Sequence, residues 1–388
     1  MITRSGTALA VASVAVLVAG RVFGLPELYL MGATGLVLVA AAVVQVRRPV
    51  PRLDVERVVH PRRVHLGGQS RVELRITNVG QRRAPVLTLH DPVAGTIGAR
   101  VSLAPLGPDD RQAASYRLPT ERRGLVRAGP LQAERTDAFG LARRRFPVAE
   151  QTALTVLPAI EPLVGLAAGG GLDDPLAGVA HPVLGSAGDE DFATLRPYVV
   201  GDDLRRVHWA STARSGDLLV RQDDPPWQGH LTVLLDAREG RLNHDRFEQA
   251  VSAAASLLHA VAARGDRARL VITDGVDTGL VDARAGRDTL LERLALVERH
   301  PGERLPEVAA DGRSRTGGLV LVTGAPDAAD LAALAAHRSR FASVRIVSIA
   351  DHLAAPAGRA GAPDLVPVPP GGSFAAAWSA ALRPAGRS

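Results

Sequence analysis

Two apolar stretches at the amino-terminal end, residues 7–25 and 28–46, constrain the fold of this chain more than any other feature. Each is about 19 residues long, roughly one bilayer crossing at a rise of about 1.5 Å per residue. Arg21 lies near the end of the first stretch, where its side chain can reach the membrane interface. The residues around Pro26 are typical of a turn. Residues 1–49 are therefore expected to form a transmembrane helical hairpin.

The positive charges predict how the hairpin is oriented. Arg4 precedes the first stretch and Arg47 and Arg48 follow the second, whereas the connecting loop offers only Arg21 against Glu27. The positive-inside rule then places both ends of the hairpin, and the rest of the chain, in the cytoplasm. The predicted location is the plasma membrane, with two passes. A cleaved signal peptide is the alternative interpretation, but the second stretch would still anchor the chain.

Composition excludes several kinds of chemistry. The chain has no cysteine and no lysine, and all 46 basic residues are arginine. Thiol nucleophiles, cysteine zinc sites and disulfides are excluded, as are a lysine-dependent P-loop and lysine Schiff bases. The formal net charge is +6, but arginines alternate with acids and aromatic residues make up only 3%. No basic stripe carries the interleaved aromatics of a nucleic-acid site. We expect no cofactor, no nucleic-acid partner and no enzymatic activity.

Short alternating apolar runs follow the hairpin. Residues 71–76 and 86–89 alternate apolar and polar side chains, and glycine or proline turn signals separate such runs. This spacing is typical of antiparallel strands in an immunoglobulin-like sandwich. We assign residues 50–160 to an all-β domain.

The carboxyl-terminal part has a different pattern, which predicts an α/β domain over residues 230–388. Residues 231–235 are continuously apolar, as in a buried parallel strand. Helical patterns follow at 247–264, 287–299, 327–340 and 373–382, and further strands are predicted at 269–273, 278–281, 318–323 and 344–349. The alternation predicts a mostly parallel sheet with helices on both faces and one antiparallel hairpin.

The order of these elements resembles the von Willebrand factor A domain. Many such domains hold a divalent cation after the first strand with the pattern DxSxS. Asp236 stands at the first position, but Arg238 and Gly240 occupy the two serine positions, and Gly324 stands where a later acid is expected. We interpret this as a degenerate metal site. Asp236 is then expected to cap the following loop or to pair with Arg238.

Residues 188–229 carry a dense signature after a glycine-rich linker at 161–187. The signature closely resembles that of the bacterial family of unknown function DUF58. Its positions here are Gly188, Phe192, Leu195, Arg196, Tyr198, Gly201, Asp202, Arg205, Val207, Trp209, Ala213, Arg214, Leu218 and Val220. The upstream pairs and turns Arg123-Gly124 and Asp137-Ala138-Phe139-Gly140-Leu141 resemble further family elements, with Ala138 in a position usually held by proline.

The resemblance implies a membrane-anchored, von Willebrand A-like protein often encoded beside MoxR-type AAA+ ATPases. We therefore expect a cytoplasmic scaffold or adaptor that binds such an ATPase or an envelope enzyme; a cation-dependent binding protein is the alternative. The signature itself allows two interpretations: a clip that holds domains together by paired charges, or guanidinium groups presented to a partner. The residues concerned are Arg196, Tyr198, Asp202, Arg205, Trp209 and Arg214.

Overall fold

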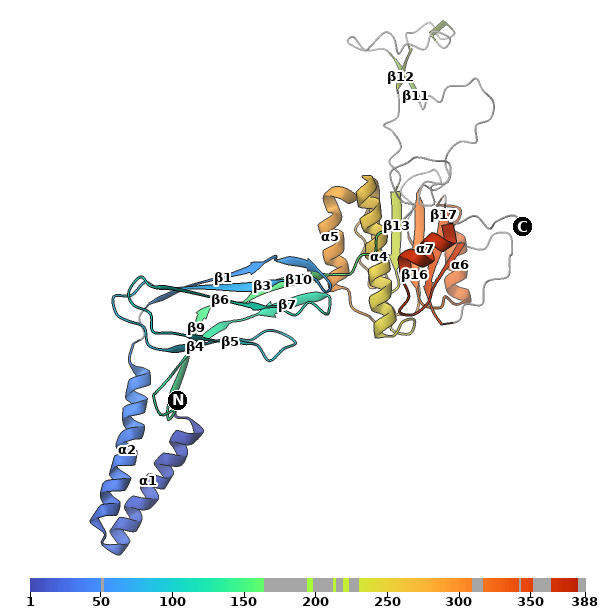
Figure 1. Ribbon diagram of the computed structural model, residues 1–388. Helices are drawn as coiled ribbons and strands as arrows, with labels where there is room; N and C mark the ends of the chain where they lie inside the picture. The colour runs from blue at the N-terminus through green and yellow to red at the C-terminus, as the bar shows by residue number, and fades with distance from the viewer. Residues whose placement is uncertain are drawn as a thin grey trace. The chain divides into compact units, whose positions relative to one another are not determined.

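The computed structural model describes residues 1–49, 52–163, 194–197, 212–213, 219–222, 230–308, 317–341, 343–351 and 364–382. These residues form two compact units, Met1–Leu157 and Pro158–Ser388. The first unit holds a helical hairpin and a β-rich domain, and the second holds an α/β domain (Figure 1). Most of the glycine-rich segment assigned to a linker lies outside the described residues.

The hairpin consists of α1 (Arg4–Phe23) and α2 (Pro26–Arg47). Both helices are long and apolar enough to cross a membrane, as the two apolar stretches predicted. Gly24 ends α1 in the left-handed region with φ of 67°, and proline opens α2, where its missing N–H costs nothing. Small residues let the helices approach closely: a Cβ added at Gly35 would lie 2.0 Å from Ser13 Oγ.

Ten strands build the β-rich domain: β1 (Leu53–His60), β2 (Arg63–His65), β3 (Arg71–Asn78), β4 (Leu87–Asp91), β5 (Ala99–Leu103), β6 (Arg111–Arg117), β7 (Gly124–Ala128), β8 (Leu131–Thr136), β9 (Arg143–Ala149) and β10 (Thr152–Leu157). They form three sheets, ordered β1-β3-β6, β2-β10-β7 and β5-β4-β8-β9. The expected antiparallel pairing holds except between β10 and β2, which run parallel.

Alternation of side chains explains the core of this domain. On β3 every second residue, Val72, Leu74 and Ile76, is completely buried, while Arg71 and Arg75 face solvent. Buried aliphatic side chains from all three sheets join them in a single cluster. The apolar residues that alternate along the sequence of β3 are thus the ones that pack in the core.

A buried polar cluster crosses the core of the β-rich domain. The Arg57 guanidinium lies 2.7 Å from Asp91 Oδ1, and the Tyr116 hydroxyl donates to Asp91 Oδ2 at 2.5 Å. Arg57 Nη1 also donates to the Ala128 carbonyl at 2.9 Å. Burial raises the pKa of Asp91, and its bonds to Tyr116 and Arg57 offset only part of that rise. The cluster ties β1, β4, β6 and β7 together.

The α/β domain is built on a six-stranded sheet in the order β15-β14-β13-β16-β17-β18. Its strands are β13 (His230–Leu235), β14 (Arg267–Ile272), β15 (Val281–Asp282), β16 (Gly318–Thr323), β17 (Ser343–Ile349) and β18 (Asp364–Val368). Only β15 is antiparallel to its neighbour. The sequence analysis expected the mostly parallel sheet and the antiparallel hairpin, although β15 begins later than the predicted strand at 278–281.

The strand β18 was not predicted from the sequence. This strand contains Pro367, and prolines also flank it at positions 363 and 369. Proline removes a donor from the hydrogen-bond ladder, so the segment did not resemble a strand. At the edge of the sheet, where only β17 pairs with it, one missing donor is tolerated.

The described helices of this domain are α4 (His244–Arg264), α5 (Ala283–Leu296), α6 (Ala328–His337) and α7 (Phe374–Leu382). Asn243, Asp282 and Asp327 cap the first three through their side chains. The α5 helix begins four residues before the predicted start at 287, because Asp282 caps it and Gly286 is accommodated inside it.

Glu161 anchors the segment that enters the α/β domain. Its carboxylate accepts the backbone N–H groups of Phe374 and Ala375 at 3.1 and 3.0 Å and the Ser373 hydroxyl at 2.5 Å. Its own N–H donates to Ser256 Oγ at 2.9 Å. A residue assigned to the flexible linker thus acts as the cap at the start of α7.

Candidate functional site

The candidate site lies at the carboxyl ends of β13 and β16, in the middle of the sheet. From β13 the chain goes first to β14 on one side, and later to β16 on the other. Such a reversal is the topological switch point of an open α/β sheet, where ligands bind outside the carboxyl ends of the strands. Asp236 follows β13, and Thr323 is the last residue of β16.

A buried guanidinium fills this position. Arg238 Nε and Nη2 donate to Asp236 Oδ1 and Oδ2, each at 2.8 Å, in a two-pronged ion pair. Arg238 Nη2 also donates to Asp330 Oδ1 at 3.0 Å, and Nη1 donates to the Glu303 carbonyl at 2.9 Å. Both residues of the pair are buried, with exposed fractions of 0% for Asp236 and 1% for Arg238.

Neighbouring elements hold the two carboxylates in place. The Thr323 hydroxyl donates to Asp236 Oδ2 at 2.6 Å. Asp330 stands in the first turn of α6, where it forms a reciprocal capping box with Asp327. Arg241 contacts Asp330 at 3.1 Å and also pairs with Asp327. The acids at the switch point are therefore fully engaged by guanidinium, hydroxyl and backbone donors.

Charge pairing sets the protonation of the cluster. Burial lowers the pKa of Arg238, but its hydrogen bonds to Asp236 and the charges of Asp236 and Asp330 outweigh that effect, so the pKa lies above its usual value. The hydrogen bond from Arg241 lowers the pKa of Asp327 to about 2. Arg238 and Asp327 are both held in their charged forms by these partners.

In this geometry the guanidinium of Arg238 occupies the carboxylate oxygens that a divalent cation would need. Arg238 places its positive charge on both oxygens of Asp236, where a metal would need a free ligand. Gly240 has no side chain, and among the described residues no atom beyond its chain neighbours lies within 4 Å of the position that a Cβ would take. Among the residues that the structure describes, no three His, Asp or Glu side chains are grouped to hold a metal ion.

Sequence reasoning missed several residues beside this cluster. The hydroxyl of Thr273 lies 2.9 Å from His300 Nε2 and accepts the Ala237 N–H at 2.9 Å. Asp330 was missed as well, although its position three residues after Asp327 at a helix start is the spacing of a capping box. The contact between His300 and Thr273 joins residues that lie far apart in the sequence, and no local sequence pattern predicts it.

The signature residues fall mainly outside the described part of the chain. Arg196 lies in β11 (Thr194–Pro197), which pairs antiparallel with β12 (Leu219–Gln222), so that Arg196 stands opposite Val220. The two ends of the signature therefore meet as a pair of strands. The following predicted residues lie outside the described residues: Tyr198, Asp202, Arg205, Trp209 and Arg214.

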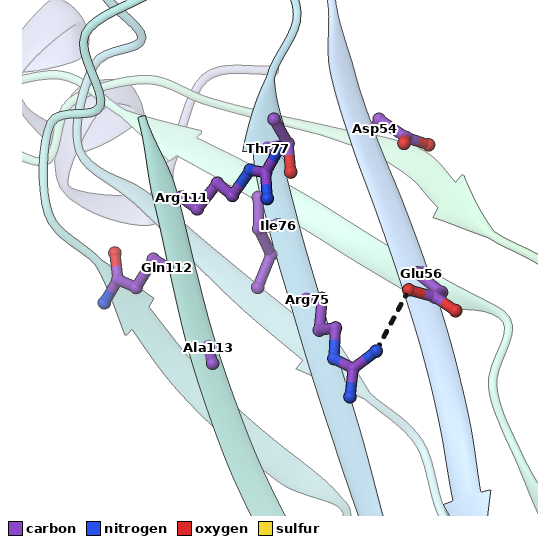
Figure 2. A pocket seen from close by; sticks show the side chains of 8 residues that line it. All are labelled: Asp54, Glu56, Arg75, Ile76, Thr77, Arg111, Gln112 and Ala113. Carbon is purple, nitrogen blue, oxygen red and sulfur yellow. Dashed lines mark ion pairs between the residues drawn. The ribbon is translucent and has the colours of Figure 1, made fainter. Parts of the chain in front are cut away.

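Apart from this site, a surface depression lies on the exposed face of β1, β3 and β6 (Figure 2). Figure 2 shows Arg75 turned toward Glu56. The two side chains lie 3.6 Å apart, and Arg75 also contacts Glu73 at 3.0 Å. These acids already neutralise the charge that could attract a ligand. We therefore do not consider this surface a functional site.

Comparisons with solved structures give only distant likenesses. The CARDB domain of the PF1109 protein from Pyrococcus furiosus is 18% identical, with a TM-score of 0.22, over 28% of this chain and 94% of that one. The β-glucosidase 3B from Thermotoga neapolitana is 16% identical, with a TM-score of 0.15, over 27% of this chain and 17% of that one. TM-scores this low carry no argument about function.

Comparisons of sequence are more specific. A stretch of 78 residues is 35% identical to the uncharacterized protein YeaD of Bacillus subtilis (strain 168), covering 20% of this chain and 19% of that protein. The chain therefore matches about a fifth of that relative's length. Residues 194–360 match the family described as "Protein of unknown function DUF58". This match over residues 194–360 confirms the resemblance to the DUF58 family that the signature predicted.

Proposed function

We propose that this protein is a two-pass membrane protein whose cytoplasmic body serves as a scaffold for a protein partner and binds that partner without a divalent cation. The observation that carries the proposal is the Arg238 guanidinium, which lies on Asp236 and Asp330 at the switch point. A von Willebrand A-type cation site would need those same carboxylate oxygens. Because the Arg238 guanidinium takes the place of a metal ion, protein binding that needs no metal is the function that the domain supports best.

The topology of the sheet supports a von Willebrand A-like arrangement. Counted along the chain from β13 as the first strand, the sheet has the order 3-2-1-4-5-6 with an antiparallel edge strand. The β-rich domain, with its two-residue alternation and packed core, supports an immunoglobulin-like sandwich as spacer or binding module. The DUF58 resemblance suggests a MoxR-type AAA+ ATPase or an envelope enzyme as partner.

Affinity capture tests the scaffold. The full chain would be tagged and recovered from native membranes beside the variants Arg196→Ala and Arg214→Ala, each checked for folding by circular dichroism. We expect wild type to enrich an AAA+ ATPase or envelope enzyme and the folded signature variants to lose it. Wild type that enriches neither would refute the proposal.

Calorimetry tests the cation. The purified wild type should give no binding heat with Mg²⁺ or Ca²⁺ at millimolar concentrations. Heat that disappears in Asp236→Asn would show that a cation displaces Arg238, and would favour the cation-dependent alternative instead.

Cysteine labelling tests the orientation, because a chain without cysteine gives no background. Single cysteines would replace Glu27, in the first turn of α2 beside the connection between the helices, and Ile97, on an exposed turn of the β-rich domain. In intact spheroplasts a membrane-impermeant maleimide should label Glu27→Cys, and it should label Ile97→Cys only after lysis. Equal labelling of both positions in intact spheroplasts would contradict the cytoplasmic placement.

A further inference from the structure

The turn between β8 and β9 is tightly built and presents an aromatic side chain. Buried Asp137 accepts the N–H groups of Phe139 and Ala142 at 2.9 and 2.6 Å. Gly140 takes the left-handed conformation that the turn requires, with φ of 68°. Phe139 is 72% exposed at the tip. The hydrogen-bonded turn therefore presents one large apolar side chain to its surroundings.

This turn is fastened to the open end of the helical hairpin. The Thr3 N–H donates to the Leu141 carbonyl at 2.9 Å, and the Arg143 N–H donates to the Met1 carbonyl at 2.9 Å. A Cβ added at Gly6 would lie 2.1 Å from the Leu141 oxygen, so the contact is close. Leu141 and Ala142 also pack in one apolar cluster with side chains of α2. Phe139 is thereby fixed near the start of α1 and the end of α2.

The lengths of the helices place this end at the level of lipid headgroups. With 20 and 22 residues, α1 and α2 extend about 30 and 33 Å at a rise of about 1.5 Å per residue. The hydrocarbon layer of a bilayer is about 30 Å thick. If the helices span it, the β8–β9 turn meets the interface on the side where the hairpin opens. Phe139 would then enter the region between headgroups and acyl chains.

Arginines of the β-rich domain join those of α2 at the same place. Arg144 Nη1 donates to the Arg47 carbonyl at 3.3 Å, and Arg135 Nη1 donates to the Arg48 carbonyl at 3.2 Å. A guanidinium has five N–H donors, and only one of each is used in these contacts. Arg143 is the first residue of β9, and it is exposed.

These arginines lack acidic partners within the described residues. No ion pair joins Arg47, Arg48, Arg135, Arg143 or Arg144 to a carboxylate there, and the nearby Glu134 pairs with Arg145 instead. Burial, together with the charges of Arg48 and Arg144, lowers the pKa of Arg135. Like charges are thus gathered without a compensating anion, an arrangement that an external anion would stabilise.

We propose that Phe139 and the arginines 47, 48, 135, 143 and 144 form a docking surface for the anionic phospholipids of the leaflet where the hairpin opens. The phosphates would accept the unused guanidinium N–H groups, and Phe139 would insert beside the acyl chains. The β-rich domain is then a membrane-interface domain rather than a free spacer. This inference rests on the proposed membrane span of α1 and α2.

Lipid titration of the full chain tests whether the arginines bind anionic phospholipids. The detergent-solubilised protein would be titrated with phosphatidylglycerol and phosphatidylcholine, and lipid adducts would be counted by native mass spectrometry. An arginine near an anionic surface contributes about fivefold in binding, so Arg135→Gln with Arg144→Gln should weaken phosphatidylglycerol binding about 25-fold. Glutamine keeps a donor for the α2 carbonyls, so the fold should persist.

A control pair of variants keeps this result interpretable. Arg71→Gln with Arg111→Gln removes the same charge from exposed positions on β3 and β6 and should leave lipid binding unchanged. Equal loss in both pairs, or equal binding of the two lipids by wild type, would overturn the proposal. If millimolar inorganic phosphate displaces phosphatidylglycerol completely, the site binds a free anion, and that result would also overturn the proposal.

Depth measurements in vesicles test whether Phe139 inserts into the membrane, and they test separately whether α1 and α2 span it. Single cysteines at Leu38 in α2, at Ala138 beside Phe139 and at Gln69 would carry an environment-sensitive dye. Gln69 lies beyond the far end of β1, whose eight residues extend about 26 Å. Lipid with a deep nitroxide should quench Leu38→Cys, and lipid with a shallow nitroxide should quench Ala138→Cys strongly and Gln69→Cys weakly. Quenching at Leu38 but not at Ala138 would overturn this inference alone, whereas no quenching at Leu38 would overturn the membrane span.

Discussion

Replacing Arg238 with leucine should strongly destabilise the α/β domain. The substitution leaves Asp236 buried with 0% exposure and without its cation, and it removes one of the two guanidinium partners of Asp330. Breaking a buried ion pair by removing one partner costs about 3–5 kcal/mol. Since about 1.36 kcal/mol corresponds to a factor of ten, local opening should become roughly 10²- to 5 × 10³-fold more frequent.

Hydrogen exchange measures this opening directly in a protein of two units. The amides of β13, which pair with β14 and β16, should exchange faster by that factor, while those of β3 should not change. Arg340→Leu provides the control, because its pair with Glu307 is exposed on both sides and should contribute at most about 1 kcal/mol. Adding Asp236→Asn to Arg238→Leu should restore part of the protection. An effect of Arg238→Leu no larger than that of Arg340→Leu would refute the reasoning.

Three further predictions concern the other contacts described above. Burial raises the pKa of Glu161, but its bonds to Ser373 and to the backbone of α7 outweigh this effect, so the pKa lies below its usual value. The contribution of Glu161 to stability should be complete above the usual pKa and be lost as the pH falls through the lowered one. Hydrogen exchange in α7 should therefore accelerate on acidification in wild type but not in Glu161→Gln. Gly35→Leu should separate α1 from α2, because a Cβ would already lie 2.0 Å from Ser13 Oγ; cysteine crosslinking across the hairpin should then fall, whereas Thr34→Leu should leave it intact. Asp91→Leu should lower the unfolding free energy of the β-rich domain by about 3–5 kcal/mol, because it leaves Arg57 buried and unpaired; a loss below about 1 kcal/mol in urea denaturation would contradict this.

The parts of the fold with strong local patterns could be predicted from sequence. The two apolar stretches became α1 and α2, and the continuous apolar run at 231–235 became the central strand β13. Alternation in β3 identified Val72, Leu74 and Ile76 as core. Each of these signals is carried by neighbouring residues, which is why reading along the chain was sufficient.

Contacts between distant residues could not be predicted in the same way. The partner of Arg238 in α6, Asp330, lies 92 residues further along the chain, and the cap of α7, Glu161, lies 213 residues before Phe374. The strand β18 was concealed by Pro367, which only its edge position tolerates. The arginines beside the hairpin belong to two different domains of the sequence, and only folding brings them together.

The pairing of Arg238 with two acids has a consequence for how the α/β domain responds to its surroundings. A metal site fills and empties with the concentration of its ion, so a protein that uses one acts partly as a sensor. A covalently attached guanidinium has no dissociation constant, and neither a chelator nor a shortage of magnesium can remove it. The positive charge at the carboxyl ends of β13 and β16 is therefore a fixed part of the chain, and it does not vary with the concentration of a metal ion.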